Sequence, residues 1–262
     1  MLDLSENKQK ALEAEGSLMV QGGPGSGKTT FALLKAQEIL KSEKLKPWQT
    51  ILFLSFARAT VARVAEKATE ILNTELMRSV EITTYHSFTW TILKSHGYLL
   101  NSKSLKIWLP HNAAPCLVQF KDNETKRAEK ERRFCEEGLI HFDLFAEKCA
   151  FLLERSNALR RVICQAYPVI IIDEFQDTDR EEWRLIQQLG KGSRLIALAD
   201  PDQRIFGFRG AEPARIGQFI SLYHPNEFNF GYENKRSNGT DILQFGNDLL
   251  GGAKYWKIVS KC

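Results

Sequence analysis

The sequence lacks the features that mark secreted, cysteine-stabilised or membrane-embedded proteins. Its five cysteines are odd in number and include no C-x-x-C pair, which argues against a disulfide framework and against a cysteine-rich zinc site. No apolar run approaches the roughly 18 residues that a membrane-spanning helix needs. The first residues also lack the basic and apolar regions of a signal peptide. We therefore expect a cytoplasmic protein without a membrane partner.

A strong excess of one charge and any internal repeat are also missing. Lysine and arginine number 36 against 32 acidic residues, and this net charge of +4 permits a polyanionic partner without requiring one. With 43% hydrophobic residues and no low-complexity tract, the chain is expected to fold into a packed globular structure. Its 262 residues suffice for one large α/β domain, or for one domain with an insertion and the start of a second.

Five short apolar runs alternate with longer stretches of helical periodicity. This alternation predicts a parallel sheet with crossover helices. Polar, acidic or glycine residues follow each run, at the sheet edge where open α/β proteins bind ligands. The expected strands are residues 17–21, 51–56, 80–84, 169–172 and 195–199.

Residues 101–137 interrupt this pattern with two prolines and a charge run at 121–133. We interpret the segment as a mainly helical insertion whose charges form i,i+4 ion pairs, in preference to a dedicated nucleic-acid patch. After Pro225 the pattern changes again, and the remaining residues are too few for a domain. The expected organisation is one α/β domain from residues 1–100 and 138–225, an insertion at 101–137, and the incomplete start of a second domain at 226–262.

A phosphate-binding loop is the most specific motif in the chain. Residues 22–29 read G-G-P-G-S-G-K-T, match G-x-x-x-x-G-K-[ST], and lie between an expected strand and an expected helix. Backbone N–H groups would surround phosphate oxygens, Lys28 would reach the β- and γ-phosphates, and Thr29 would bind Mg²⁺. An ordinary glycine-rich turn would not need the lysine–threonine pair. We therefore expect ATP with Mg²⁺ to bind at Gly22, Gly23, Pro24, Gly25, Ser26, Gly27, Lys28, Thr29 and Thr30.

Acidic and amide side chains follow two other expected strands. Asp173 would hold Mg²⁺ through its water shell, and Glu174 would act as the general base, which favours hydrolysis over transfer to an acceptor. The alternative is a pair of solvated acids at a strand end. Gln203, in the string D-P-D-Q, is a plausible γ-phosphate sensor, although a single glutamine after a strand is more often a loop residue.

Two longer strings resemble the UvrD/Rep/PcrA group of superfamily 1 DNA helicases. They are D-E-F-Q-D-T at 173–178 and D-P-D-Q-R-I-F-G-F-R-G-A at 200–211. Four further segments resemble motifs of the same group: Leu4 with Gln9 (the Q motif), 55–59 (segment Ia), 84–88 (T-F-H-S) and 234–237 (motif IV).

The resemblance implies a RecA-like domain called 1A, a shortened helical insertion called 1B, and a nucleotide cleft against a second RecA-like domain called 2A. It implies that Gln9 contacts adenine, that Gln203 senses the γ-phosphate, and that Arg236 approaches from the far side of the cleft. It also implies a partner, single-stranded DNA or a 3′-tailed duplex, and movement from 3′ to 5′. The DNA-binding residues would be Phe56, Arg58, His86, Phe206, Phe208 and Arg209.

The DNA-binding residues also make physical sense without the family. Bases of single-stranded DNA stack on aromatic rings, at roughly 1–3 kcal/mol each, while cations pair with phosphates. Phe206 and Phe208, followed by Arg209, provide both groups just after Gln203. For Phe56 a place in the core is about equally consistent, and His86 alone would be taken as a structural histidine.

The sequence departs from the family at several positions. Lys235 replaces the adenine-stacking tyrosine, Thr30 replaces an arginine, and Ala199 replaces a glycine. Motifs V and VI are absent from these residues, so we expect the chain alone to bind ATP but hydrolyse it poorly. The leading interpretation is the motor part of a DNA helicase. Alternatives are a nucleotide-gated subunit that regulates a partner such as a nuclease, in DNA repair or anti-phage defence, or an unrelated P-loop kinase or NTPase, which the D-E-F-Q-D-T string disfavours.

Overall fold

A six-stranded parallel sheet forms the centre of the molecule. The computed structural model describes residues 5–43, 45–201 and 214–231. The strand order is β3-β2-β6-β7-β1-β8, and every pairing is parallel, so the predicted α/β fold with a parallel sheet is confirmed. The strands are β1 (Leu18–Gln21), β2 (Ile51–Ser55), β3 (Val80–Thr84), β6 (Val169–Ile172), β7 (Arg194–Ala199) and β8 (Asn226–Asn229).

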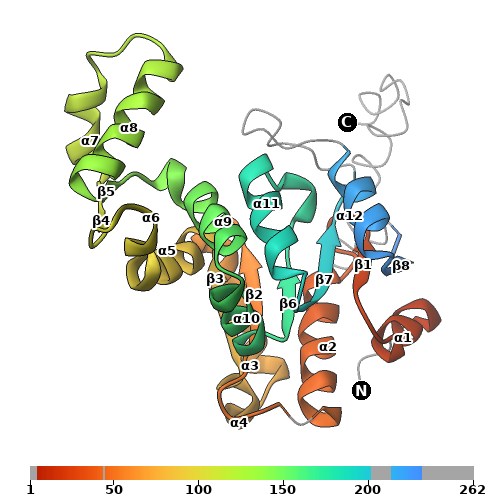
Figure 1. Cartoon of the computed structure of the whole chain (residues 1–262). Helices are drawn as coiled ribbons and strands as arrows, with labels where there is room; N and C mark the ends of the chain where they lie inside the picture. Colours follow the sequence, from red (N-terminus) through yellow and green to blue (C-terminus); the bar gives the residue numbers. More distant parts are fainter. Residues whose placement is uncertain (1–4, 44, 202–213, 232–262) are drawn as a thin grey trace, which may run out of the picture.

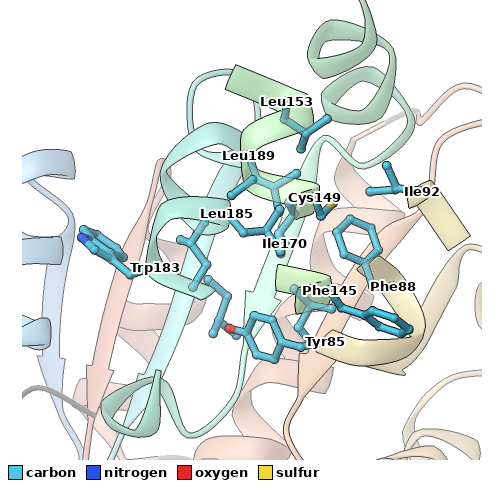
Figure 2. Close-up of a cluster of buried hydrophobic side chains, with 14 of the residues drawn as sticks. Tyr85, Phe88, Ile92, Phe145, Cys149, Leu153, Ile170, Trp183, Leu185 and Leu189 are labelled. Carbon is cyan, nitrogen blue, oxygen red and sulfur yellow. The ribbon is translucent and has the colours of Figure 1, made fainter. Parts of the chain in front are cut away.

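Helices cover both faces of this sheet (Figure 1). Alternate residues of each strand point to opposite faces, so Leu52 and Leu54 enter one core cluster while Ile51 and Phe53 enter the other. The first cluster, drawn in Figure 2, packs against α5 (Tyr85–His96), α9 (Phe145–Arg155), α10 (Asn157–Ala166), α11 (Arg180–Leu189) and α12 (Arg215–Tyr223). The second packs against α1 (Glu6–Glu13), α2 (Lys28–Ser42), α3 (Arg58–Ile71) and α4 (Thr74–Met77). No helix among the described residues is long and apolar enough to cross a bilayer.

The charge-rich insertion forms a small lobe that projects beyond one end of the sheet (Figure 1). Within it, Arg132 pairs with Glu129 at 2.8 Å and Arg133 pairs with the same glutamate at 2.7 Å. These i,i+3 and i,i+4 pairs neutralise much of the charge run, so the helix has an ion-paired, solvated surface. The elements of this part of the chain are α6 (Tyr98–Asn101), β4 (Lys106–Ile107), α7 (Pro110–Leu117), α8 (Asn123–Glu137), β5 (Leu139–Ile140) and η1 (Phe142–Leu144).

The prediction that a second domain starts at residue 226 is wrong, because the first residues of that segment belong to the central sheet. Asn226–Asn229 forms β8, which pairs in parallel with β1, from Leu18 opposite Asn226 to Gln21 opposite Asn229. The next residue, Phe230, is buried and packs edge-on against Phe31, with ring centroids 5.0 Å apart. The prediction missed this strand because an edge strand can be mostly polar, and N-E-F-N contains only one apolar side chain.

Candidate nucleotide site

Three neighbouring strands of the sheet end at the candidate site. These strands lie side by side in the order β6-β7-β1. Asp173 follows β6, Asp200 follows β7, and the phosphate loop follows β1. Because all three strands are parallel, their carboxyl ends meet at one edge. Asp200 therefore lies between the phosphate loop and the acidic pair Asp173–Glu174.

The phosphate loop has a backbone that only glycine accommodates easily. Gly25 and Gly27 have φ values of 75° and 90°, in the left-handed region. A Cβ atom on Gly22 would lie 2.7 Å from the Oγ of Ser26, inside the loop. The Ser26 Oγ is itself buried and has no hydrogen-bond partner among the described residues. This close, polar loop at the start of α2 fits a phosphate group, which the N–H groups of the first helical turn would bind.

Lys28 places its ammonium group among carboxylates. Its Nζ donates to the carbonyl oxygens of Gly22 and Gly23, the latter at 3.1 Å, and lies 3.9 Å from Oδ2 of Asp200. Burial lowers the pKa of Lys28, while the negative charges of Asp200, Glu174 and Asp173 act in the opposite direction. The Lys28 ammonium therefore lies among three acidic side chains, whose charge it partly offsets.

Asp173 is a buried carboxylate that suits a divalent cation. It is 3% exposed, and burial raises its pKa to about 7, with a further contribution from the charge of Glu174. Thr29, in the first turn of α2, supplies a hydroxyl oxygen. Carboxylate and hydroxyl oxygens are hard donors of the kind that Mg²⁺ prefers, usually together with water and substrate phosphates. The donor set therefore fits Mg²⁺.

Glu174 has an unusual backbone conformation for a non-glycine residue, with φ 51° and ψ 43°. The short turn η2 (Phe175–Asp177) follows it, and the Asp177 N–H donates to the Glu174 carbonyl oxygen at 2.9 Å. The half-buried carboxylate of Glu174 accepts a hydrogen bond from the Nε2 of Gln176 at 2.8 Å. Non-glycine residues in this region are strained and are concentrated at functional sites. The geometry is consistent with a carboxylate that is held for a chemical role.

Gln176 is a site residue that the sequence analysis missed. It is 5% exposed, and besides its bond to Glu174 its Oε1 accepts the backbone N–H of Asp200 at 2.9 Å. The side chain thus connects the proposed general base to Asp200, the first residue after β7. Asp200 itself, 1% exposed and beside Lys28, was also missed. The acidic residues around Gln176 were a local hint of a role, but its contact with Asp200, 24 positions along the chain, has no local signal.

Replacing Gln176 with alanine is expected to lower ATP turnover by roughly 10- to 150-fold, because a hydrogen bond to a charged group contributes about 1.5–3 kcal/mol. ADP affinity should stay nearly unchanged, since the Gln176 side chain bonds to Glu174, Asp177 and Asp200 and not to the phosphate loop. Steady-state ATPase rates and an ADP titration measure the two effects. Gln187→Ala, on α11, is the matched control. An equal fall in the ATPase rate of both variants would show that Gln176 has no specific role in turnover.

Three of the expected DNA-binding residues follow the adjacent strands β2 and β3. Phe56, just after β2, is half-buried, and its ring lies 5.0 Å from that of Tyr85. Arg58 is the first residue of α3 and is exposed. His86 is exposed near the start of α5, and its ring lies 6.0 Å from that of Phe142. The structure therefore brings Phe56, Arg58 and His86 to one edge of the sheet.

Of the remaining expected site residues, Thr30 lies in the first turn of α2, Gln9 lies on α1, and the others are outside the described ranges. Gln9 is exposed on α1 and donates to Glu13 of the same helix at 3.2 Å. The side chain that α1 brings to the phosphate loop is that of Lys8, whose Nζ donates to the Ser26 carbonyl oxygen at 2.7 Å. The roles of Gln203, Phe206, Phe208, Arg209 and Arg236, all outside the described residues, stay predictions.

Comparison with known proteins identifies a family. The model of the UvrD/REP helicase N-terminal domain matches residues 4–135 and 119–224. An ATP-dependent helicase/nuclease subunit from Lactococcus lactis is 26% identical over 250 residues, which cover 89% of this chain and 20% of that protein. A probable DNA helicase II homolog from Mycoplasma pneumoniae is 25% identical over 289 residues, covering 90% and 40%. The chain thus spans well under half the length of these relatives.

Two further matches are more limited. A RecBCD enzyme subunit RecB from Mycolicibacterium smegmatis is 35% identical over 107 residues, which cover 40% of this chain and 10% of that protein. Among solved structures, the Pif1 helicase from Candida albicans aligns over 95% of this chain and 44% of that chain, with a TM-score of 0.48 and 15% identity.

Proposed function

Because this chain belongs to the UvrD/REP helicase family, we propose that it is the ATP-binding motor part of a DNA helicase that moves along single-stranded DNA from 3′ to 5′. The observation that carries the proposal is the arrangement of Lys28 within the phosphate loop and near Asp200, Asp173 and Glu174. A phosphate-binding lysine, a metal-binding carboxylate and a candidate base are the parts that ATP hydrolysis requires.

The chemistry assigns a separate task to each residue. Lys28 and the loop N–H groups bind the β- and γ-phosphates, and Thr29 with Asp173 would hold Mg²⁺, which neutralises phosphate charge when it is bound. Glu174 accepts a proton from the attacking water. The water oxygen forms a bond to the γ-phosphorus while the bond to the bridging oxygen breaks, which leaves ADP and inorganic phosphate.

Coupling to DNA would run through the residues that follow β7. Gln176 joins the carboxylate of Glu174 to the backbone of Asp200, the first of these residues. Loss of the γ-phosphate would change the contacts of Gln203, and we expect this change to move Phe206 and Phe208, which would grip the DNA. Alternating grip during cleft closure and opening would then move the motor along one strand.

A second candidate function follows from the names of the relatives. One of them is named as a helicase/nuclease subunit, and another is named as part of a RecBCD enzyme. Under this alternative the chain would be part of a nucleotide-gated subunit that regulates a nuclease partner, in DNA repair or in defence against phage DNA. Such a protein would bind nucleotide without needing DNA-stimulated turnover.

The two functions are distinguished by the ATPase rate of the full-length protein with and without single-stranded DNA. The motor function predicts clear stimulation by DNA, and the nucleotide-gated function predicts none.

In the double variant Phe206→Ala/Phe208→Ala we expect the affinity for single-stranded DNA to fall at least about tenfold, since each stacked base contributes about 1–3 kcal/mol. Phe151→Ala, at an exposed ring on α9, is the control. An unaltered DNA titration in the double variant would refute the aromatic contact.

A further inference from the structure

Lys8 is buried against the phosphate loop, although it lies on a mostly exposed helix. It is 9% exposed, whereas its neighbours Asn7, Gln9 and Lys10 on α1 are exposed. Its Nζ donates to the carbonyl oxygen of Ser26 at 2.7 Å and lies 5.3 Å from the centre of the Phe230 ring. Lysine is rarely buried to this extent.

The contact fixes the orientation of one peptide group in the loop. In a trans peptide the carbonyl oxygen and the N–H point in opposite directions. Since the Ser26 oxygen points to Lys8 of α1, the N–H of Gly27 points away from α1. Backbone N–H groups turned to one side of such a loop form the concave surface that binds an anion.

Lys8 also adds positive charge beside the loop. A Cβ atom on Gly27 would lie 3.4 Å from the Lys8 Nζ, which places the ammonium next to the residue that precedes Lys28. The ring of Phe230 offers a favourable surface for this cation. The N-terminal helix, the phosphate loop and the end of β8 therefore meet at one ammonium group.

We infer that Lys8 is a positioning residue of the phosphate loop, which orients the Ser26–Gly27 peptide for phosphate binding and places a cation beside Gly27, in addition to that of Lys28. This inference rests on the proposed nucleotide binding. It assigns to α1 a role in phosphate binding that is separate from the adenine contact expected of Gln9.

The test is a titration of the whole chain with ADP and with AMP. Lys8→Met removes the ammonium at similar side-chain length, and we expect it to weaken ADP binding about tenfold, the effect of losing one charge-assisted hydrogen bond. The loss should be smaller for AMP, because AMP has no β-phosphate for the loop. Lys8→Arg should restore most of the ADP affinity, which a general packing defect would not allow.

The control is Lys10→Met on the same helix, where the side chain is 65% exposed and pairs with Glu6 at 2.7 Å. Thermal denaturation without nucleotide identifies unfolded variants. If Lys8→Met does not fold, Lys8→Gln replaces it with the same expected loss, because its stem is one atom shorter. Wild-type ADP affinity in Lys8→Met, or equal loss in Lys10→Met, overturns the role of Lys8 alone. Failure of the wild-type chain to bind ADP overturns the proposed function as well.

Discussion

Lys28→Ala is expected to reduce ADP and ATP affinity by at least about 100-fold, or ~2.7 kcal/mol. Part of the loss is the charge-assisted contact to phosphate. The rest is electrostatic, because Asp200, Glu174 and Asp173 act on the Lys28 ammonium as nearby negative charges. Without the ammonium, these carboxylates would repel the incoming phosphates. Titration with a fluorescent ADP analogue measures the effect.

Two companion variants separate this effect from a general defect. Lys41→Ala lies in the last turn of the same helix, is exposed, and should bind ADP as the wild type does. Lys28→Arg keeps the charge but should not restore binding, because the planar guanidinium does not fit where Lys28 meets the carbonyl oxygens of Gly22 and Gly23. If Lys28→Ala binds ADP within about twofold of wild type, the phosphate-binding assignment fails.

The central strands could be predicted from the sequence because they are apolar along their whole length. The run at 169–172 was exact, and the run at 195–199 missed only Arg194, which begins β7. β8 could not be found this way, since three of its four residues are polar and its pairing with β1 joins segments far apart in the sequence. Apolar periodicity reports burial, and an edge strand has little of it.

The residues of the candidate site divide along similar lines. Lys28, Asp173 and Glu174 were found because a motif gives each of them a chemical role. The sequence did not point to Gln176, Asp200 or Lys8, because each acts through a contact with a segment distant in sequence. Lys8 and Ser26, for example, are 18 positions apart. No local pattern encodes such a contact. The left-handed backbone of Glu174 was equally invisible, since the sequence there contains no glycine to mark it.

Glu174→Gln is expected to preserve ATP binding and to lower turnover by about 10²–10⁴-fold, the usual contribution of a general base. Glutamine has the shape of glutamate, so the turn after β6 and its φ of 51° should persist. The amide oxygen can still accept the hydrogen bond from the Nε2 of Gln176. What disappears is the ability to take a proton from water.

Binding of the metal and nucleotide should survive this change for an electrostatic reason. Burial is the main cause of the raised pKa of Asp173, and the negative charge of Glu174 is the second. Removing that charge therefore makes Asp173 easier to ionise. The lost negative charge also reduces repulsion of the phosphates. Glu181→Gln on α11, where the carboxylate pairs with Arg184 at 2.6 Å, is the control and should keep full activity. Single-turnover ATP hydrolysis with DNA present measures the chemical step directly, and equal rates in Glu174→Gln and wild type would show that another group acts as the base.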